Sequence, residues 1–242
     1  MLRPMKEKVV LVTGGGRGIG RATVSLFAHA GAKVAFCGRS EGERLGVANE
    51  ITAAGGTVRA FAVDIASQRE VHRMVSEIVS QWGKIDLLIN NAGVLGSKKT
   101  LATYPTETWD EVIRINVNGT FYVTQAVVRE MIPRRSGTIF SVSSSVGRKG
   151  RASWGAYAVS KFALEGMMQT LAEEVAEFGI RVMTLNPEAT RTQMRAKAYE
   201  KEDPATLKNP EAVAKALFDL AKSSDPVLQG QSLNFSDLPL EV

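Results

Sequence analysis

The sequence has few of the residues that disulfide-rich scaffolds and structural metal sites require. Its 242 residues include one cysteine, Cys37, and two histidines. A single cysteine cannot form a disulfide within the chain, and no Cys/His cluster has the spacing of zinc ligands. We therefore expect no metal site, and we expect a protein of a reducing, cytoplasmic compartment.

Long apolar segments and a strong charge excess are also absent. The short, charged segment Met1–Lys8 leads directly into the apolar run Val9–Val12, which leaves no room for a signal peptide, and no run could span a bilayer. The formal net charge is +5, and the basic residues are scattered. We expect no membrane or nucleic-acid partner. The positive balance either attracts small anions such as phosphorylated cofactors or simply favours solubility.

What the sequence does contain is a regular alternation of apolar runs and helical patterns. Runs with little polar alternation predict strands covered on both faces, at 9–12, 34–37, 58–63, 87–89, 138–142, 182–185 and 231–235. Apolar residues at three- and four-residue spacing predict helices at 21–30, 43–54, 69–81, 107–117, 121–131, 157–178 and 212–221. The alternation predicts one α/β domain over 1–242, a doubly wound parallel sheet of about seven strands with helices on both faces.

Ligands of such sheets bind outside the carboxyl ends of the strands, and the first strand is followed there by the glycine-rich loop 13–20. Its glycines let backbone N–H groups approach a pyrophosphate, whose charge the following helix N-terminus favours. A tight strand-to-helix turn is the structural alternative. After the second run, Gly38–Arg39 lacks the acid that bonds the ribose of NAD, whereas arginine suits the 2′-phosphate of NADP.

A candidate catalytic pair follows the fifth run. Tyr157 and Lys161 are one turn apart on a predicted helix, so their side chains share a face. A nearby ammonium lowers the pKa of a phenol, which is about 10 when free. Such a tyrosine can exchange a proton with an alcohol or its alkoxide. Ser144 ends the fifth run, thirteen residues before the tyrosine. Packing is the usual role of a helical tyrosine with no such partners.

Together these segments resemble the short-chain dehydrogenase/reductase family from about Lys8 to Phe235. The resemblance rests on TGxxxGxG in 13–20, on Asn-Asn-Ala-Gly at 90–93 and on the catalytic segment 116–161. It is strongest to 3-oxoacyl-[acyl-carrier-protein] reductases and to a poorly characterised bacterial subgroup. It implies a Rossmann fold and a catalytic set of Asn116, Ser144, Tyr157 and Lys161. It also implies cofactor contacts from Tyr157, Lys161 and the following residues: Gly14, Gly16, Arg17, Gly18, Ile19, Gly20, Arg39, Asp64, Ile65, Asn91, Ala92, Gly93, Pro187, Thr190 and Thr192.

The same resemblance implies a cofactor, a reaction and an assembly. Gly38 stands at the family's usual acidic position, and Arg17 and Arg39 match two basic positions of its NADP-preferring members, which implies NADP(H) in preference to NAD(H). A solvated loop arginine is the alternative for Arg39. The implied substrate is a small carbonyl/alcohol pair, a ketone or a 3-oxoacyl compound that is free or carrier-linked, and the implied assembly is a homotetramer or homodimer. A non-enzymatic NADP(H)-binding regulator is the competing interpretation, although such relatives have lost the tyrosine that this chain keeps.

Two segments depart from this pattern or leave it open. Glu188 follows Pro187 where the family usually has glycine, and its bulk and charge predict weaker NADPH binding unless it points to solvent. Arg148, Lys149 and Arg151 either hold an anionic substrate or form a solvated rim. The polar segment 187–210 is predicted to be a surface segment or a lid over the substrate pocket.

Overall fold

The sheet defines the architecture of this protein. The computed structural model describes residues 4–223 and 225–238, so the ends of the predicted 1–242 domain and the first residues of the Met1–Lys8 segment lie outside the described residues. Seven parallel strands form one sheet in the order β3-β2-β1-β4-β5-β6-β7. They are β1 (Val9–Thr13), β2 (Lys33–Cys37), β3 (Thr57–Phe61), β4 (Leu87–Asn90), β5 (Gly137–Val142), β6 (Ile180–Asn186) and β7 (Ser232–Asn234). The predicted doubly wound parallel sheet is thereby confirmed.

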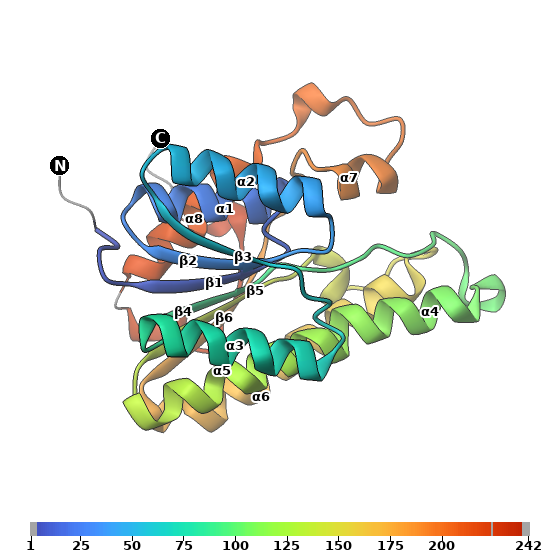
Figure 1. The fold of residues 1–242 in the computed structure, drawn as a ribbon. Coiled ribbons are helices and arrows are strands. Elements are labelled where there is room, and N and C mark those ends of the chain that lie inside the picture. Colours follow the sequence, from blue (N-terminus) through green and yellow to red (C-terminus); the bar gives the residue numbers. More distant parts are fainter. Residues whose placement is uncertain (1–3, 224, 239–242) are drawn as a thin grey trace.

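Helices cover both faces of the sheet (Figure 1). One face packs against α1 (Gly18–His29), α2 (Glu41–Ala53) and α8 (Pro210–Lys222), and the other packs against α3 (Gln68–Trp82), α5 (Thr120–Met131) and α6 (Gly155–Val175). The short helix α4 (Thr106–Ile113) precedes α5, and α7 (Gln193–Ala198) stands away from the sheet in the predicted lid. In the described ranges, no helix is both long and apolar enough to cross a membrane.

Each central strand contributes to two cores. All five residues of β1 are buried. Val10 and Val12 pack toward α1, α2 and α8, whereas Val9 and Leu11 pack toward α3, α5 and α6. Because successive side chains point to opposite faces, a strand covered on both sides must be apolar at nearly every position. This requirement explains why the apolar runs predicted the strands.

The ends of the helices follow local chemistry, with one exception. Gly31, Gly55, Gly83 and Gly179 all have positive φ just after a helical segment, as the predicted glycine stops require. The exception is the predicted helix 107–117, because α4 ends at Ile113 and a π-helical turn, Arg114–Gly119, connects it to α5. Such wider turns occur frequently at functional sites, and this one contains Asn116.

Candidate active site

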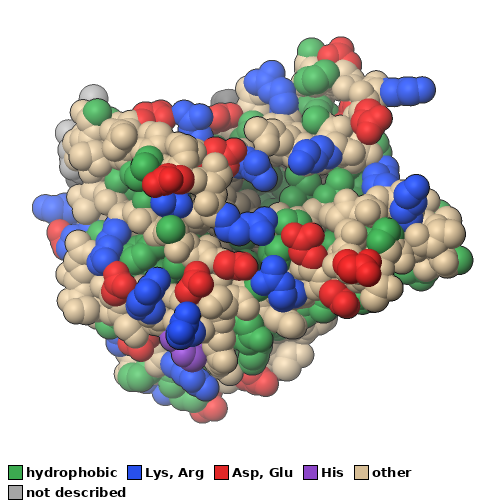
Figure 2. Space-filling view, turned by 45° about the vertical axis from the view of Figure 1, so that its right-hand side comes forward, with side chains coloured by type: hydrophobic (Ala, Val, Ile, Leu, Met, Phe, Trp, Pro, Cys, Tyr) green, Lys and Arg blue, Asp and Glu red, His purple; other side chains and the backbone are tan. Residues whose placement is uncertain are grey.

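A cleft of about 1770 Å³ lies at the carboxyl ends of the strands, beside the point where the strand order reverses between β1 and β4. Figure 2 shows the hollow with Lys and Arg side chains on its rim. The structure brings most of the predicted site residues to its wall, while Gly20 and Asn116 lie behind the wall. Those that line it are Gly14, Gly16, Arg17, Gly18, Ile19, Arg39, Asp64, Ile65, Asn91, Ala92, Gly93, Ser144, Tyr157, Lys161, Pro187, Thr190 and Thr192.

The glycine loop has the shape of a phosphate cradle. Gly14 and Gly18 have φ values of +68° and +53°, which side chains of L-residues rarely allow. A Cβ on Gly20 would lie 2.1 Å from the Gly14 carbonyl oxygen, so only glycine lets α1 pack this close to the loop. The N-cap of α1, Arg17, makes no side-chain cap bond, so no capping side chain occupies the first N–H groups of the helix. Uncapped N–H groups at a helix N-terminus are suited to an anion.

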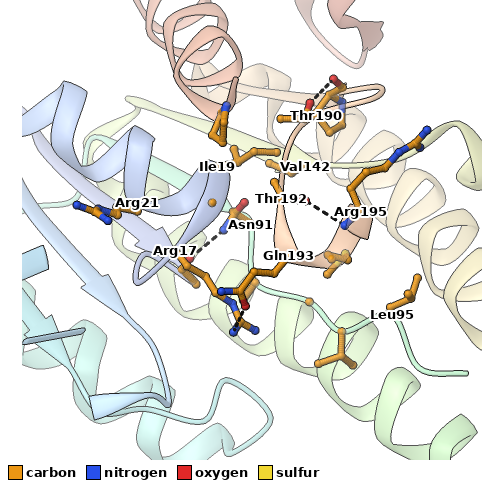
Figure 3. A pocket seen from close by; sticks show the side chains of 18 of the residues that line it. Arg17, Ile19, Arg21, Asn91, Leu95, Val142, Thr190, Thr192, Gln193 and Arg195 are labelled. Atoms are coloured by element: carbon orange, nitrogen blue, oxygen red, sulfur yellow. Dashed lines mark hydrogen bonds between the residues drawn. The ribbon is translucent and has the colours of Figure 1, made fainter. Parts of the chain in front are cut away.

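Arginines line the same end of the cleft. Arg17 donates to Gln193 Oε1 at 3.0 Å and to Glu43 Oε1 at 3.4 Å, and Figure 3 shows Gln193 directed from α7 toward it. Arg39 also lines the cleft. Burial raises the pKa of Asp64. Hydrogen bonds from the Ala66 N–H and from Arg114, together with the charges of Arg114 and Arg39, outweigh the burial and lower that pKa.

The Asn-Asn-Ala-Gly segment connects β4 to the glycine loop. The Asn91 side chain donates to the carbonyl oxygens of Thr13 and Gly14, at 3.0 and 3.1 Å. The backbone N–H groups of Asn91 and Ala92 both donate to the Thr13 hydroxyl. Inside the fold, the Asn90 side chain donates to Thr124 and Ser141. The segment therefore fixes the loop that borders the cleft.

The predicted catalytic pair is close together. The Lys161 Nζ atom lies 5.7 Å from the centre of the Tyr157 ring, and it donates to the Val142 carbonyl oxygen at 2.7 Å. Burial raises the pKa of Tyr157 to about 12, against a hydrogen bond with Ser144 that lowers it. Burial also lowers the pKa of Lys161 to about 8, against the charge of Glu165. The direction is opposite to the expected lowering of the tyrosine pKa, because desolvation of the phenolate outweighs the hydrogen bond with Ser144.

The Asn116 side chain connects three segments of the chain behind the cleft. Its Oδ1 atom accepts from the Val94 N–H at 2.8 Å, and its Nδ2 atom donates to the Val94 carbonyl at 2.9 Å and to the Ser160 hydroxyl at 3.0 Å. These bonds hold the segment after Gly93 against the π-helical turn and α6. The hydrogen bonds of the Asn116 side chain therefore fix the wall of the cleft at Val94.

A small apolar cluster surrounds the tyrosine at the other end of the cleft. Tyr157 packs with Val146, Leu95, Met194 and the Trp154 ring, whose centre is 5.7 Å away. Above this cluster, the Lys98 Nζ atom lies over the rings of Trp154 and Tyr199 and donates to the Ala198 carbonyl. Sequence reasoning missed Leu95, Lys98 and Tyr199, because the first two lie in the loop after β4 and Tyr199 follows α7 much later in the chain, so no local pattern links them.

The predicted lid segment 187–210 is attached through Glu188 to the turn after the last strand. This residue has a φ of +56°, and its carboxylate accepts from Lys208 at 3.1 Å and from the Ser236 hydroxyl at 2.6 Å. Lys208 also donates to the Pro187 carbonyl at 2.9 Å. The alternative in which Glu188 points freely to solvent is therefore wrong. Within the lid, the Thr192 hydroxyl caps α7 by accepting from the Arg195 N–H.

The basic residues between Ser144 and Tyr157 have different roles. Arg148 points inward and donates to Glu165, Asn234 and the Leu233 carbonyl, so its donors are engaged within the protein. Lys149 and Arg151 are exposed, in agreement with the solvated-rim interpretation.

Comparisons with known proteins agree with this geometry. The family profile described as short chain dehydrogenase matches residues 8–203. The uncharacterized oxidoreductase YciK of Escherichia coli (strain K12) is 39% identical over 85% of this chain and 82% of its own. The 3-oxoacyl-[acyl-carrier-protein] reductase FabG of Thermotoga maritima is 35% identical over 94% and 95%. A short chain dehydrogenase from Shigella flexneri 2a str. 301, crystallised with NADP, is 36% identical and superposes with a TM-score of 0.92 over 98% of this chain and 100% of its own. The chain belongs to the short chain dehydrogenase family.

Proposed function

We propose that this protein is an NADP(H)-dependent oxidoreductase that reduces a ketone or a 3-oxoacyl compound. The observation that carries the proposal is a buried phenol, Tyr157, with the Lys161 ammonium 5.7 Å from its ring centre, at the end of a cleft whose opposite end is a glycine cradle. Phosphate-binding geometry and a proton donor in one cleft are what carbonyl reduction with a nicotinamide dinucleotide requires.

The residues at the nucleotide end fit NADP(H). The loop 13–20 and the uncapped start of α1 would hold the pyrophosphate, and Arg17 and Arg39 would hold the 2′-phosphate. No acid stands at Gly38 to favour NAD. The related Shigella protein crystallised with NADP supports the same choice. When bound, NADPH supplies the hydride for reduction of the carbonyl carbon.

The chain's own residues handle the proton. With a pKa of about 12, the Tyr157 phenol is neutral at physiological pH and is ready to donate its proton to the carbonyl oxygen. The Ser144 hydroxyl, which lines the cleft beside the phenol and lowers its pKa, would orient that oxygen. The Lys161 ammonium would stabilise the negative charge that develops on the tyrosine. Asn116 would hold the cleft wall through Val94.

The protonation state gives Tyr157 the role of an acid in the reduction. A phenol that keeps its proton at neutral pH can donate it to the oxygen of the carbonyl that accepts the hydride. The related Thermotoga protein is named as a 3-oxoacyl reductase, which supports this class of substrate. The apolar cluster of Leu95, Trp154 and Met194 beside the tyrosine suits an apolar chain next to the carbonyl.

NADPH consumption against a panel of ketones, acetoacetyl esters and sugars tests the proposal. Tyr157→Phe keeps the ring against Trp154 and removes only the proton donor. We expect it to lose about 10²- to 10⁴-fold in kcat, with the Kd for NADPH changed little. Equal turnover by both proteins would overturn the role of Tyr157. Tight NADPH binding with no turnover of any carbonyl by the wild type would favour the non-enzymatic regulator.

We also propose that the protein assembles as a homodimer or homotetramer. Phe121 on α5 and Val159 and Phe162 on α6 are large apolar side chains that are 44%, 42% and 46% exposed. Burial of such side chains against a second copy would be favourable. Light scattering of the wild type and of Phe162→Lys tests this assembly, with dissociation expected in the variant. The cytoplasmic location and a carrier-linked substrate stay predictions.

A further inference from the structure

A buried carboxylate lies directly behind the candidate catalytic residues. Glu165 is 4% exposed, and it is one turn beyond Lys161 on α6. Its Oε1 atom accepts from the Ser143 hydroxyl at 2.5 Å and from Arg148 at 3.3 Å. Its Oε2 atom accepts from the Thr184 hydroxyl at 2.8 Å and from the Ser232 hydroxyl at 2.6 Å. Four donors to a buried carboxylate stabilise its charged form, and burial is the only opposing influence on its lowered pKa.

These bonds connect α6 to the strand end that carries Ser144. Val142 accepts from Lys161, and the next residue, Ser143, donates to Glu165. Two consecutive residues of the chain are thus attached to two helix residues one turn apart. Ser144 comes immediately after them, so its position relative to Tyr157 depends on both attachments.

Glu165 is also the anion that faces the Lys161 ammonium. Residues four apart on a helix are neighbours, and the charge of Glu165 opposes the effect of burial on the pKa of Lys161. The other charged or titratable groups close by are Tyr157 on the same helix and Arg148 after β5. Arg148 directs its two terminal nitrogens to Asn234 and Leu233, away from α6. Its charge offsets part of the field of Glu165 and leaves the remainder for Lys161.

We propose that Glu165 is a positioning residue for the reaction, which holds Ser144 and Tyr157 in register and supplies the negative charge that faces the Lys161 ammonium. The effect of Glu165 on the reaction rate rests on the proposed function, whereas its effect on Lys161 does not. Glu165 is not part of the family motifs, and it does not belong to the apolar wall of the cleft. Neither feature therefore explains a buried carboxylate with four hydrogen-bond donors.

Glu165→Gln tests the inference, because it keeps the shape of the side chain and removes its charge. We expect the alkaline limb of the pH profile of kcat/KM for reduction to move down by about one pH unit, and kcat/KM at pH 8 to fall roughly fivefold. The KM for NADPH should change little. Ser232→Ala is the matched control, since it removes one hydrogen bond but keeps the carboxylate, and its alkaline limb should stay in place.

A second measurement needs no turnover. The ¹³C signal of the Lys161 ε-carbon, identified by its absence in Lys161→Arg, reports the protonation midpoint of that amine. A lower midpoint in Glu165→Gln supports the inference even if no carbonyl compound is reduced, in which case only the proposed function fails. An unchanged midpoint overturns it.

The single variant leaves Arg148 as a partly buried cation without its carboxylate, which destabilises the fold. The double variant Glu165→Gln/Arg148→Gln removes both charges, and it is compared with Arg148→Gln alone. A lower Lys161 midpoint in the double variant supports the inference, and equal midpoints refute it.

Discussion

Replacing Glu188 by alanine and, separately, by glycine measures two opposing contributions to the free energy of unfolding. The φ of +56° places Glu188 in the left-handed region, which costs an L-residue roughly 1–2 kcal/mol. Alanine keeps this cost and glycine removes it. Both variants lose the carboxylate, which binds Lys208 within the segment 187–210 and Ser236 after β7.

The stabilising contribution to the free energy of unfolding comes from the contacts of the Glu188 carboxylate. The side chains of Lys208 and Glu188 are 21% and 30% exposed, so their ion pair contributes no more than about 1 kcal/mol. The hydrogen bond from the Ser236 hydroxyl adds about 1 kcal/mol. We therefore expect Glu188→Ala to lower the free energy of unfolding by about 1–2 kcal/mol. In Glu188→Gly the relief of strain offsets that loss, and the net change should be within ~1 kcal/mol of zero.

Urea unfolding of the two variants is the assay. Glycine should be more stable than alanine here, the reverse of their order in ordinary helices and strands. Since Lys208 neutralises the carboxylate, the Kd for NADPH at low salt should agree with the wild type within about fivefold in both variants. Equal or greater stability of Glu188→Ala relative to Glu188→Gly would refute the strain argument. A much larger gain in NADPH affinity for the glycine variant would instead support direct repulsion of the cofactor.

Three further predictions concern the cofactor and the proton. Arg39→Asp should weaken NADP(H) binding by roughly 10- to 100-fold, because a charge-assisted bond to the 2′-phosphate is lost, and should leave NAD(H) binding similar or improved. If the ratio of the Kd values for NADP(H) and NAD(H) is unchanged, Arg39 does not contact the 2′-phosphate. Reduction should be constant below pH 8 and should fall as pH rises through about 8, since Lys161 loses its proton there; a rate that rises across this range contradicts the role of the ammonium. Gly20→Ala should abolish NADPH binding or folding, because its Cβ would lie 2.1 Å from the Gly14 carbonyl oxygen. Fluorescence measures the binding and circular dichroism measures the folding. Normal NADPH binding would show that the loop adapts to the side chain.

Much of the fold could be predicted from the sequence because the relevant information is local. The runs 9–12 and 138–142 lie inside β1 and β5, since strands buried on both faces must be apolar throughout. Glycines mark the helix ends because a positive φ is easiest without a side chain. The spacing of Tyr157 and Lys161 predicted their proximity because one helical turn separates them.

Other features depend on residues that are far apart in the chain. The π-helical turn at 114–119 accompanies the bonds of Asn116 to Val94, and the partners of Glu188 are twenty and forty-eight residues away. The partners of Glu165 come from β6, β7 and the segment after β5. Local patterns alone determined the strands, the glycine loop and the spacing of the catalytic pair. Tertiary packing decided the pKa of Tyr157 and the partners of Glu165 and Glu188, because desolvation and ion pairing depend on neighbours that only the folded chain assembles.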